Sequence, residues 1–133
     1  MGGAVFLTLP ETLVIFAEIT GVSQISRPHL RDLGLLESAI AQPMQTFDGR
    51  DLYPSLEEKA AALLHSLCQN QPFIDGNKRV AFVAMRTFLR MNERDIAVDT
   101  YEAIEFMLSV ARGEIGRDKI AWWIAERLCR YEG

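Results

Sequence analysis

Two apolar segments with helical spacing, joined by a short polar loop, constrain the fold of this chain most strongly. The first segment begins at Ser55, which forms a capping box with Glu58, and its apolar stripe comprises Leu56, Ala60, Leu63, Leu64, Leu67 and Cys68. The second segment, residues 80–91, is apolar almost all round, which predicts a central helix contacted from several sides. The loop at residues 71–79 is therefore expected to be held by the core on both sides.

The remaining pattern is also helical. Apolar periodicity predicts a helix from Pro10 to near Gly21, a short helix over residues 35–43, a helix over residues 101–112 and a last helix over residues 117–130. Asp99 or Thr100 is expected to cap the third of these. The Asp48-Gly49 pair predicts a two-residue hairpin turn. Residues 1–133 are thus predicted to form a single all-α domain of about six helices with one small β-hairpin.

Composition narrows the functional classes. The net charge of −4 and the isoelectric point near 5.2 argue against a broad basic surface, so neither nucleic acid nor a membrane is expected as a direct partner. Cys68 and Cys129 lie in apolar, apparently helical segments and are expected to be reduced core thiols. Polar residues interrupt the apolar run at residues 4–17, and no basic leader precedes it, so we expect a cytoplasmic protein.

The loop itself has the chemistry of a phosphate site. If Asp75 caps the second helix, the backbone amides of Gly76, Asn77 and Lys78 are its first unpaired donors, and they lie at the positive end of the helix dipole. The Asn77 side chain adds a neutral donor, and Lys78 and Arg79 add a point charge and a bidentate fork. Asp75 is suited to hold Mg²⁺, which uses only one or two protein carboxylates.

A plainer interpretation fits the same residues. Asp75 could be an ordinary helix cap, and Lys78 and Arg79 could be solvated residues of a first helical turn. Arg86 and Arg90, further along the same segment, either extend a cationic strip or are solvated. Local spacing leaves these alternatives open.

Residues 71–79 resemble the signature of the Doc branch of the Fic family. That signature reads His, a variable residue, Phe, a variable residue, Asp or Glu, Gly or Ala, Asn, Lys or Gly, and Arg. This chain matches it everywhere except at the first position, which is Gln71. Residues 31–39, 51–54, 57–67 and 111–114 are also similar to Doc-type toxins, so the resemblance covers most of the chain.

The resemblance implies a role for each residue of the loop. Asp75 would be the Mg²⁺ ligand and part of the catalytic set, Phe73 would anchor the loop, and Gly76, Asn77, Lys78 and Arg79 would hold nucleotide phosphates. Relatives with Gly at the Lys78 position mostly transfer AMP. The Doc branch has Lys there and is understood to transfer the terminal phosphate of ATP, so Lys78 favours a protein Ser/Thr kinase.

The resemblance also implies partners. The hairpin at Thr46, Phe47, Asp48 and Gly49 matches a flap that docks the target segment. The target would be a translation factor, elongation factor Tu by resemblance. Inhibition would come from a Phd-type antitoxin, whose disordered tail folds as a helix in a groove of this domain. Trp122 and Trp123 are adjacent, so one of them is expected to be exposed and offers a weak hint of that groove.

Gln71 occupies the position of the family's catalytic histidine. A glutamine amide orients a hydroxyl but accepts no proton, so the chain is expected to be nearly inactive as written. A deliberate substitution that silences a lethal toxin and a natural variant that has lost activity both explain Gln71, and the otherwise intact loop favours the first. His65 and His29 are both interpreted as structural. An AMP-transferase and a noncatalytic module that binds an antitoxin remain as alternative functions.

Overall fold

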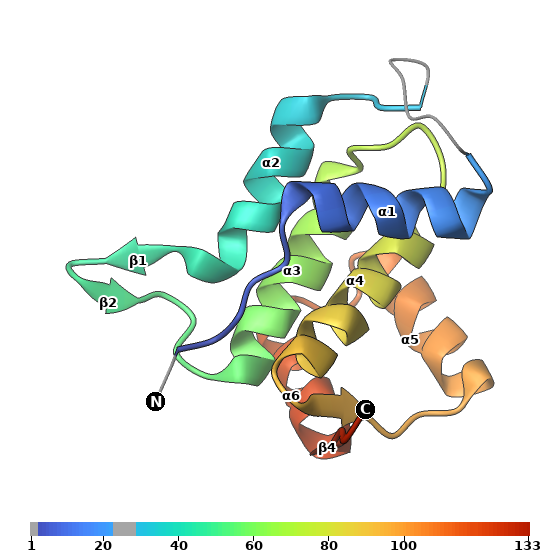
Figure 1. The fold of residues 1–133 in the computed structure, drawn as a ribbon. Coiled ribbons are helices and arrows are strands. Elements are labelled where there is room, and N and C mark those ends of the chain that lie inside the picture. The colour runs from blue at the N-terminus through green and yellow to red at the C-terminus, as the bar shows by residue number, and fades with distance from the viewer. Residues whose placement is uncertain (1–2, 23–28) are drawn as a thin grey trace.

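The computed structural model describes residues 3–22 and 29–133. Within these residues the chain forms six α-helices, a short 3-10 helix and two small antiparallel sheets (Figure 1). The helices are α1 Leu9–Thr20, α2 Leu33–Ala41, α3 Leu56–Asn70, α4 Asn77–Met91, α5 Thr100–Ala111 and α6 Arg117–Arg127. The strands are β1 Thr46–Phe47, β2 Arg50–Asp51, β3 Arg94–Ile96 and β4 Leu128–Arg130, and the 3-10 helix is Gln42–Met44. The predicted all-α class is confirmed.

Helix starts follow local capping chemistry. Ser55 and Glu58 form the predicted capping box, because the hydroxyl of Ser55 accepts from the Glu58 amide and the Glu58 carboxylate accepts from the Ser55 amide. Thr8 and Glu11 form a second capping box at α1. Asp99 caps α5 by accepting from the amide of residue 102 at 2.8 Å.

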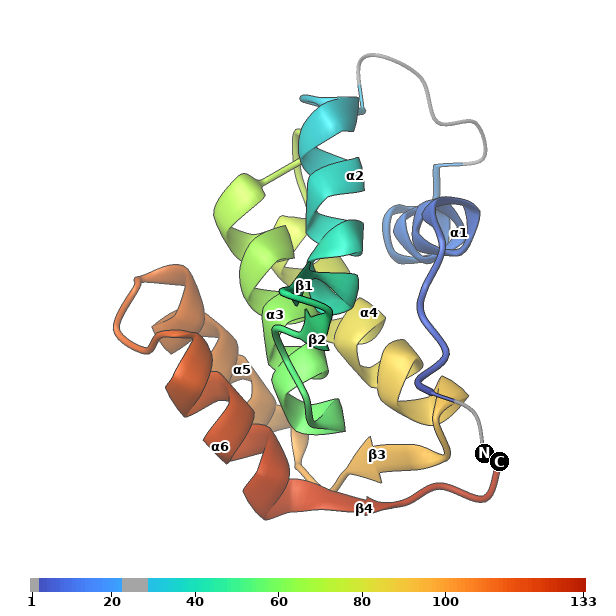
Figure 2. The same cartoon turned by 90° about the vertical axis from the view of Figure 1, so that its left-hand side faces the viewer.

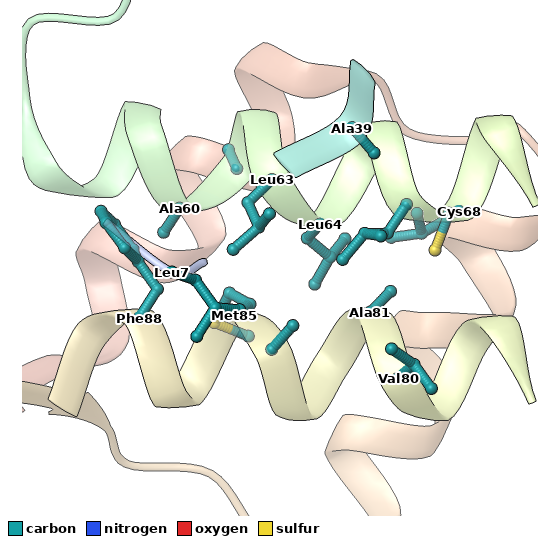
Figure 3. Packing of buried hydrophobic residues seen from close by; sticks show 14 of the residues in the cluster. Leu7, Ala39, Ala60, Leu63, Leu64, Cys68, Val80, Ala81, Met85 and Phe88 are labelled. Carbon is teal, nitrogen blue, oxygen red and sulfur yellow. The ribbon is translucent and has the colours of Figure 1, made fainter. Parts of the chain in front are cut away.

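The core lies between α3 and α4, with α2 and α6 packed on other sides of α3 and α1 across α4 (Figures 1 and 2). The buried cluster includes Leu63, Leu64, Val80, Met85 and Phe88, which face one another from the two helices (Figure 3). The sequence predicted that residues 80–91 would form a central helix contacted from several sides, and α4 packs against α3, α1, α5 and β3. Helix α3 is also surrounded, and its three consecutive buried alanines at residues 60–62 leave room for its neighbours. Helix α4 keeps one exposed face.

A second sheet corrects the expected end of the last helix. Helix α6 stops at Arg127, and Leu128–Arg130 turns extended to pair antiparallel with Arg94–Ile96, placing Asp95 opposite Cys129. Arg86 and Arg90 of α4 both bind the carboxylate of Asp95 and so hold β3 in place. The backbone edge of β3 is then open for pairing with residues 128–130. The expectation of a helix to residue 130 was therefore wrong, and the pairing of β3 with β4 was not predicted.

The predicted hairpin is present as β1 and β2 and projects from the helices (Figure 1). Asp48 and Gly49 have φ values of 54° and 76°, which is the left-handed geometry of a tight turn matched to strand twist. All four strand residues are exposed, and 77% of Phe47 is accessible. Among the described residues no helix is long and apolar enough to cross a membrane.

Candidate functional site

The candidate site begins where α3 ends. Gln71 adopts φ 46° and ψ 59°, and its amide donates to the carbonyl of Leu67 at 3.3 Å. For a residue with a Cβ, this left-handed conformation costs about 1–2 kcal/mol, so surrounding contacts must hold it. Gln71 is exposed. Strained backbone at an exposed position is typical of functional sites.

An adjacent segment braces the loop from behind. Leu30 forms an isolated antiparallel bridge with Phe73, the amide of Arg31 donates to the Pro72 carbonyl at 2.7 Å, and the amide of Ile74 donates to His29 at 3.0 Å. The Phe73 ring is buried and stacks on Phe16 with centroids 4.2 Å apart. Phe73 thus anchors the loop in the core.

The start of α4 differs from the expectation by one residue. Gly76, with φ 85°, is the N-cap, and no side chain in the described part of the chain caps the helix. Asp75 does not cap α4, because its Oδ1 accepts from the adjacent amide of Gly76 at 2.8 Å. The first intrahelical bond runs from the amide of Val80 to the carbonyl of Gly76. The amides of residues 77–79 therefore have no acceptor among the described residues and form the open donor set at the positive helix end.

Asn77 is placed by the loop backbone. Its Oδ1 accepts from the amide of Phe73 at 2.9 Å, and its Nδ2 donates to the Phe73 carbonyl at 2.8 Å. The side chain was expected to offer a neutral donor to phosphate, but it instead closes the loop into a ring. What Asn77 presents at the helix end is its backbone N–H.

Lys78 and Arg79 are exposed and lie at a groove of about 490 Å³ between α1, α4 and α5. The rest of the groove is largely apolar, with Ile19, Phe82, Val83, Val98, Ala103, Ile104, Met107 and Leu108 along it. Arg86 also lines the groove, but its guanidinium binds Asp95 at 3.0 and 3.1 Å. Arg86 and Arg90 therefore do not extend a strip of free cations, because both bind Asp95, although 45% of the Arg90 side chain is exposed. Trp122 is exposed on α6 and does not line this groove.

A sequence model of the Fic/DOC family matches residues 9–89, which is more than half of the chain and includes the loop and its bracing segment. The chain belongs to the Fic/Doc family. It is also 46% identical over 94 residues to the curated protein "Toxin Doc" of Mycolicibacterium smegmatis (strain ATCC 700084 / mc(2)155), covering 69% of this chain and 72% of that protein. The resemblance to the Doc branch of the Fic/Doc family is therefore confirmed.

The donor set of this Fic/Doc site fits a polyphosphate with a divalent ion. Three open amides and two exposed cations suit phosphate oxygens. The Asp75 carboxylate is exposed, and its second oxygen has no hydrogen-bond donor among the described residues. Among the described residues, no three or more His, Cys, Asp or Glu side chains are grouped so that they could hold a metal ion. A single carboxylate fits Mg²⁺, which takes most of its ligands from water and phosphate.

Other polar groups lie elsewhere in the Fic/Doc fold. His65 is half-buried in a separate pocket beside Arg117, and burial together with that guanidinium lowers the pKa of its imidazole. This position agrees with a structural role for His65. Arg31 is a residue that sequence reasoning missed, although it lies in a segment that resembles Doc proteins. Its Nε donates to the Gln71 carbonyl at 2.7 Å across 40 residues of sequence, and no local spacing indicates such a contact.

Proposed function

We propose that the active form of this protein is a Doc-like toxin of a toxin–antitoxin system. It transfers the terminal phosphate of Mg-ATP to a Ser or Thr hydroxyl of a translation factor in the cytoplasm, by resemblance elongation factor Tu, and so blocks translation. The observation that carries the proposal is the open set of backbone amides at residues 77–79, with Lys78 and Arg79 beside position 71. Transferase chemistry on a nucleotide is what the Fic/Doc family implies.

Each loop residue has a role in this reaction. The three amides and the two cations bind and orient the phosphate chain, and Gly76 supplies the left-handed turn that aims the amides outward. Asp75 would hold Mg²⁺, which when bound neutralises charge on the phosphates. Asn77 and Phe73 keep the loop in the shape that makes these donors converge. Lys78 in place of Gly favours phosphate transfer over AMP transfer.

Position 71 is where the target hydroxyl would lose its proton. A histidine there could accept the proton, whereas Gln71 cannot, and a missing general base costs about 10²–10⁴ in rate. The intact loop with a non-titrating residue at this position supports a silenced enzyme, and deliberate substitution remains our preferred explanation.

The hairpin of β1 and β2 is proposed to dock the target. Its strands are exposed, and Thr46–Gly49 present an open edge with the accessible Phe47 ring at its turn. An extended peptide can add to such an edge through main-chain hydrogen bonds. The hairpin precedes the N-terminal end of α3 and Gln71 follows its C-terminal end, so a target docked on this edge would extend along α3 to reach position 71.

The inhibitor is proposed to be a Phd-type antitoxin that occupies the groove between α1, α4 and α5. A mostly apolar groove with Lys78 and Arg79 at its edge suits an amphipathic helix that carries acidic residues near the phosphate site. A segment bound there would cover the cations that ATP requires. Antitoxin binding and ATP binding are therefore expected to compete.

The decisive experiment restores the base with Gln71→His and uses Gln71→Asn as the matched, non-titrating control. We expect Gln71→His to arrest growth and, when purified, to add one phosphate to elongation factor Tu in the presence of Mg-ATP. Intact-protein mass spectrometry distinguishes this product from an AMP adduct, which would replace the kinase by the AMP-transferase. Normal growth and an unmodified target, with folded Gln71→His protein, would reject catalysis. If Mg-ATP binding were also lost, the noncatalytic antitoxin-binding module would be favoured.

A further inference from the structure

We propose that Arg31 is a positioning residue for position 71, holding the residue at the site of proton transfer in its left-handed conformation. The effect on the conformation of residue 71 follows from the geometry alone, whereas the effect on catalysis rests on the proposed function. Arg31 is not part of the motif at residues 71–79. Among the described residues, its guanidinium contacts neither the open amides at the start of α4 nor the β1–β2 hairpin.

The contact is a fork onto the end of α3. Arg31 Nε donates to the carbonyl of Gln71 at 2.7 Å, and its terminal NH2 group donates to the carbonyl of Asn70. The last carbonyls of a helix have no intrahelical donor, and they lie at the negative end of the helix dipole. One planar cation that serves two consecutive carbonyls fixes the peptide plane between them, which a lysine ammonium does less well.

Arg31 is itself held firmly. Its own amide and that of Asp32 both donate to the Pro72 carbonyl, at 2.7 and 3.2 Å. Asp32 is also the N-cap of α2, because its Oδ1 accepts from the amide of Leu35 at 3.1 Å. The segment that leads into α2 and the loop after α3 lie side by side at one end of the molecule (Figure 1). The backbone that carries the guanidinium is thus fixed at the start of α2.

Position 71 depends on this support because its side chain offers none. Gln71 is exposed, and its side chain has no hydrogen bond to a described residue. The backbone φ and ψ therefore fix the direction of its Cα–Cβ bond, from which the side-chain rotamers extend. A general base must lie within hydrogen-bond reach of the proton it takes, and a displacement of about 1 Å can cost about 10²-fold in rate. A guanidinium that locks the backbone at residues 70 and 71 therefore fixes the starting point from which the base reaches the target.

The first test measures conformation in the chain as it stands. The intraresidue HN–Hα NOE at residue 71, which is strongest at left-handed φ, and amide exchange at residues 71, 73 and 74 are compared for the unchanged protein, Arg31→Lys, Arg31→Met and the control Arg130→Met. Arg130 is exposed on β4, at the opposite end of the molecule from the loop (Figure 1). We expect a weaker NOE and exchange faster by about 10-fold only in the Arg31 variants. An unchanged NOE and unchanged exchange in Arg31→Lys would overturn the proposal, including where Arg31→Met fails to fold.

The second test separates positioning from simple stabilisation. In the Gln71→His background, Arg31→Lys should lower kcat by about 10-fold or more while KM for Mg-ATP changes less than twofold. A Tm loss with kcat unchanged per folded molecule would make Arg31 a structural brace and overturn the catalytic role. If Gln71→His itself transfers nothing, the proposed function fails, whereas the NOE and amide exchange at residue 71 still decide the conformational role of Arg31.

Discussion

Asn77 closes the loop at residues 71–79 on Phe73 through two hydrogen bonds, one accepted from the Phe73 amide at 2.9 Å and one donated to the Phe73 carbonyl at 2.8 Å. The pair joins the first residue of α4 to the buried aromatic anchor. An asparagine is suited to this task because its carboxamide carries a donor and an acceptor in one plane. The motif asparagine therefore shapes the site from within.

Substitution of Asn77 should separate loop shape from charge. Asn77→Ala leaves both partners on Phe73 unpaired in a part-buried setting, so the free energy of unfolding should fall by about 1–3 kcal/mol in urea titrations. Asn77→Asp keeps the acceptor but places a negative charge at the proposed anion site. The loss of binding free energy for Mg-ATP should therefore exceed the loss of unfolding free energy. Lys78→Met is the matched control, because it removes a charge without disturbing the ring. An unchanged urea midpoint in Asn77→Ala would contradict this account.

Lys59 should set the orientation of the flap. Only 7% of its side chain is exposed, and its Nζ donates to Asp51 Oδ2 at 3.1 Å and to the carbonyls of Tyr53 and Pro54. Lys59→Met would leave those carbonyls without their donor, which should cost about 2 kcal/mol of unfolding free energy. Amide exchange at residues 46–51 should accelerate while the loop at residues 73–77 stays protected. Arg50→Met, on the exposed strand β2, should leave both regions unchanged.

Asp95 should give the fold an acid-sensitive contribution. Burial raises the pKa of its carboxyl, but hydrogen bonds from Arg86, the Ile96 amide and Arg90 outweigh burial and hold the pKa below its ordinary value. Because the folded pKa is depressed, the stabilisation is present above the unfolded pKa of about 3.9 and is lost as the pH falls through the folded pKa.

The matching experiment is urea unfolding of Asp95→Asn from neutral to acidic pH. At pH 7 the free energy of unfolding of the variant should be about 2 kcal/mol lower than that of the unchanged protein, since charge-assisted hydrogen bonds from two arginines disappear. At acidic pH this difference in unfolding free energy should shrink, because the unchanged protein then loses the same interaction. The control is Glu105→Gln, an exposed position on α5. A deficit that is constant across the range would refute the pH dependence.

The two cysteines should differ in reactivity. Cys129 is exposed on β4, which corrects its expected place in the core, whereas Cys68 is buried. Burial raises the pKa of the Cys68 thiol to about 11, and the charge of Lys78 only partly opposes this. Ellman's reagent at pH 8 should titrate one thiol in the native protein and a second only in denaturant. Cys129→Ser should abolish the native reaction, and a persisting fast phase would show that Cys68 is accessible.

Much of the site could be predicted because its signals are local. The Ser55–Glu58 capping box, the Asp48-Gly49 turn and the run of residues 71–79 all involve groups within a few positions of one another. Short-range hydrogen bonds and φ preferences act before any tertiary contact forms, so the residue types alone indicate them. The sequence by itself thus determined the helical class, the hairpin, the family and the position of the loop at residues 71–79.

Tertiary structure decided the features that depend on distant partners. Arg31 reaches Gln71 across 40 positions, and Asp95 binds both Arg86 and Arg90, which the sequence interpreted either as a cationic strip or as solvated residues. Residues 128–130 follow helical periodicity, yet they pair with β3 because a held strand edge offers backbone partners that a helix end lacks. Such contacts arise only when the fold brings remote groups together, so no pattern along the chain could reveal them.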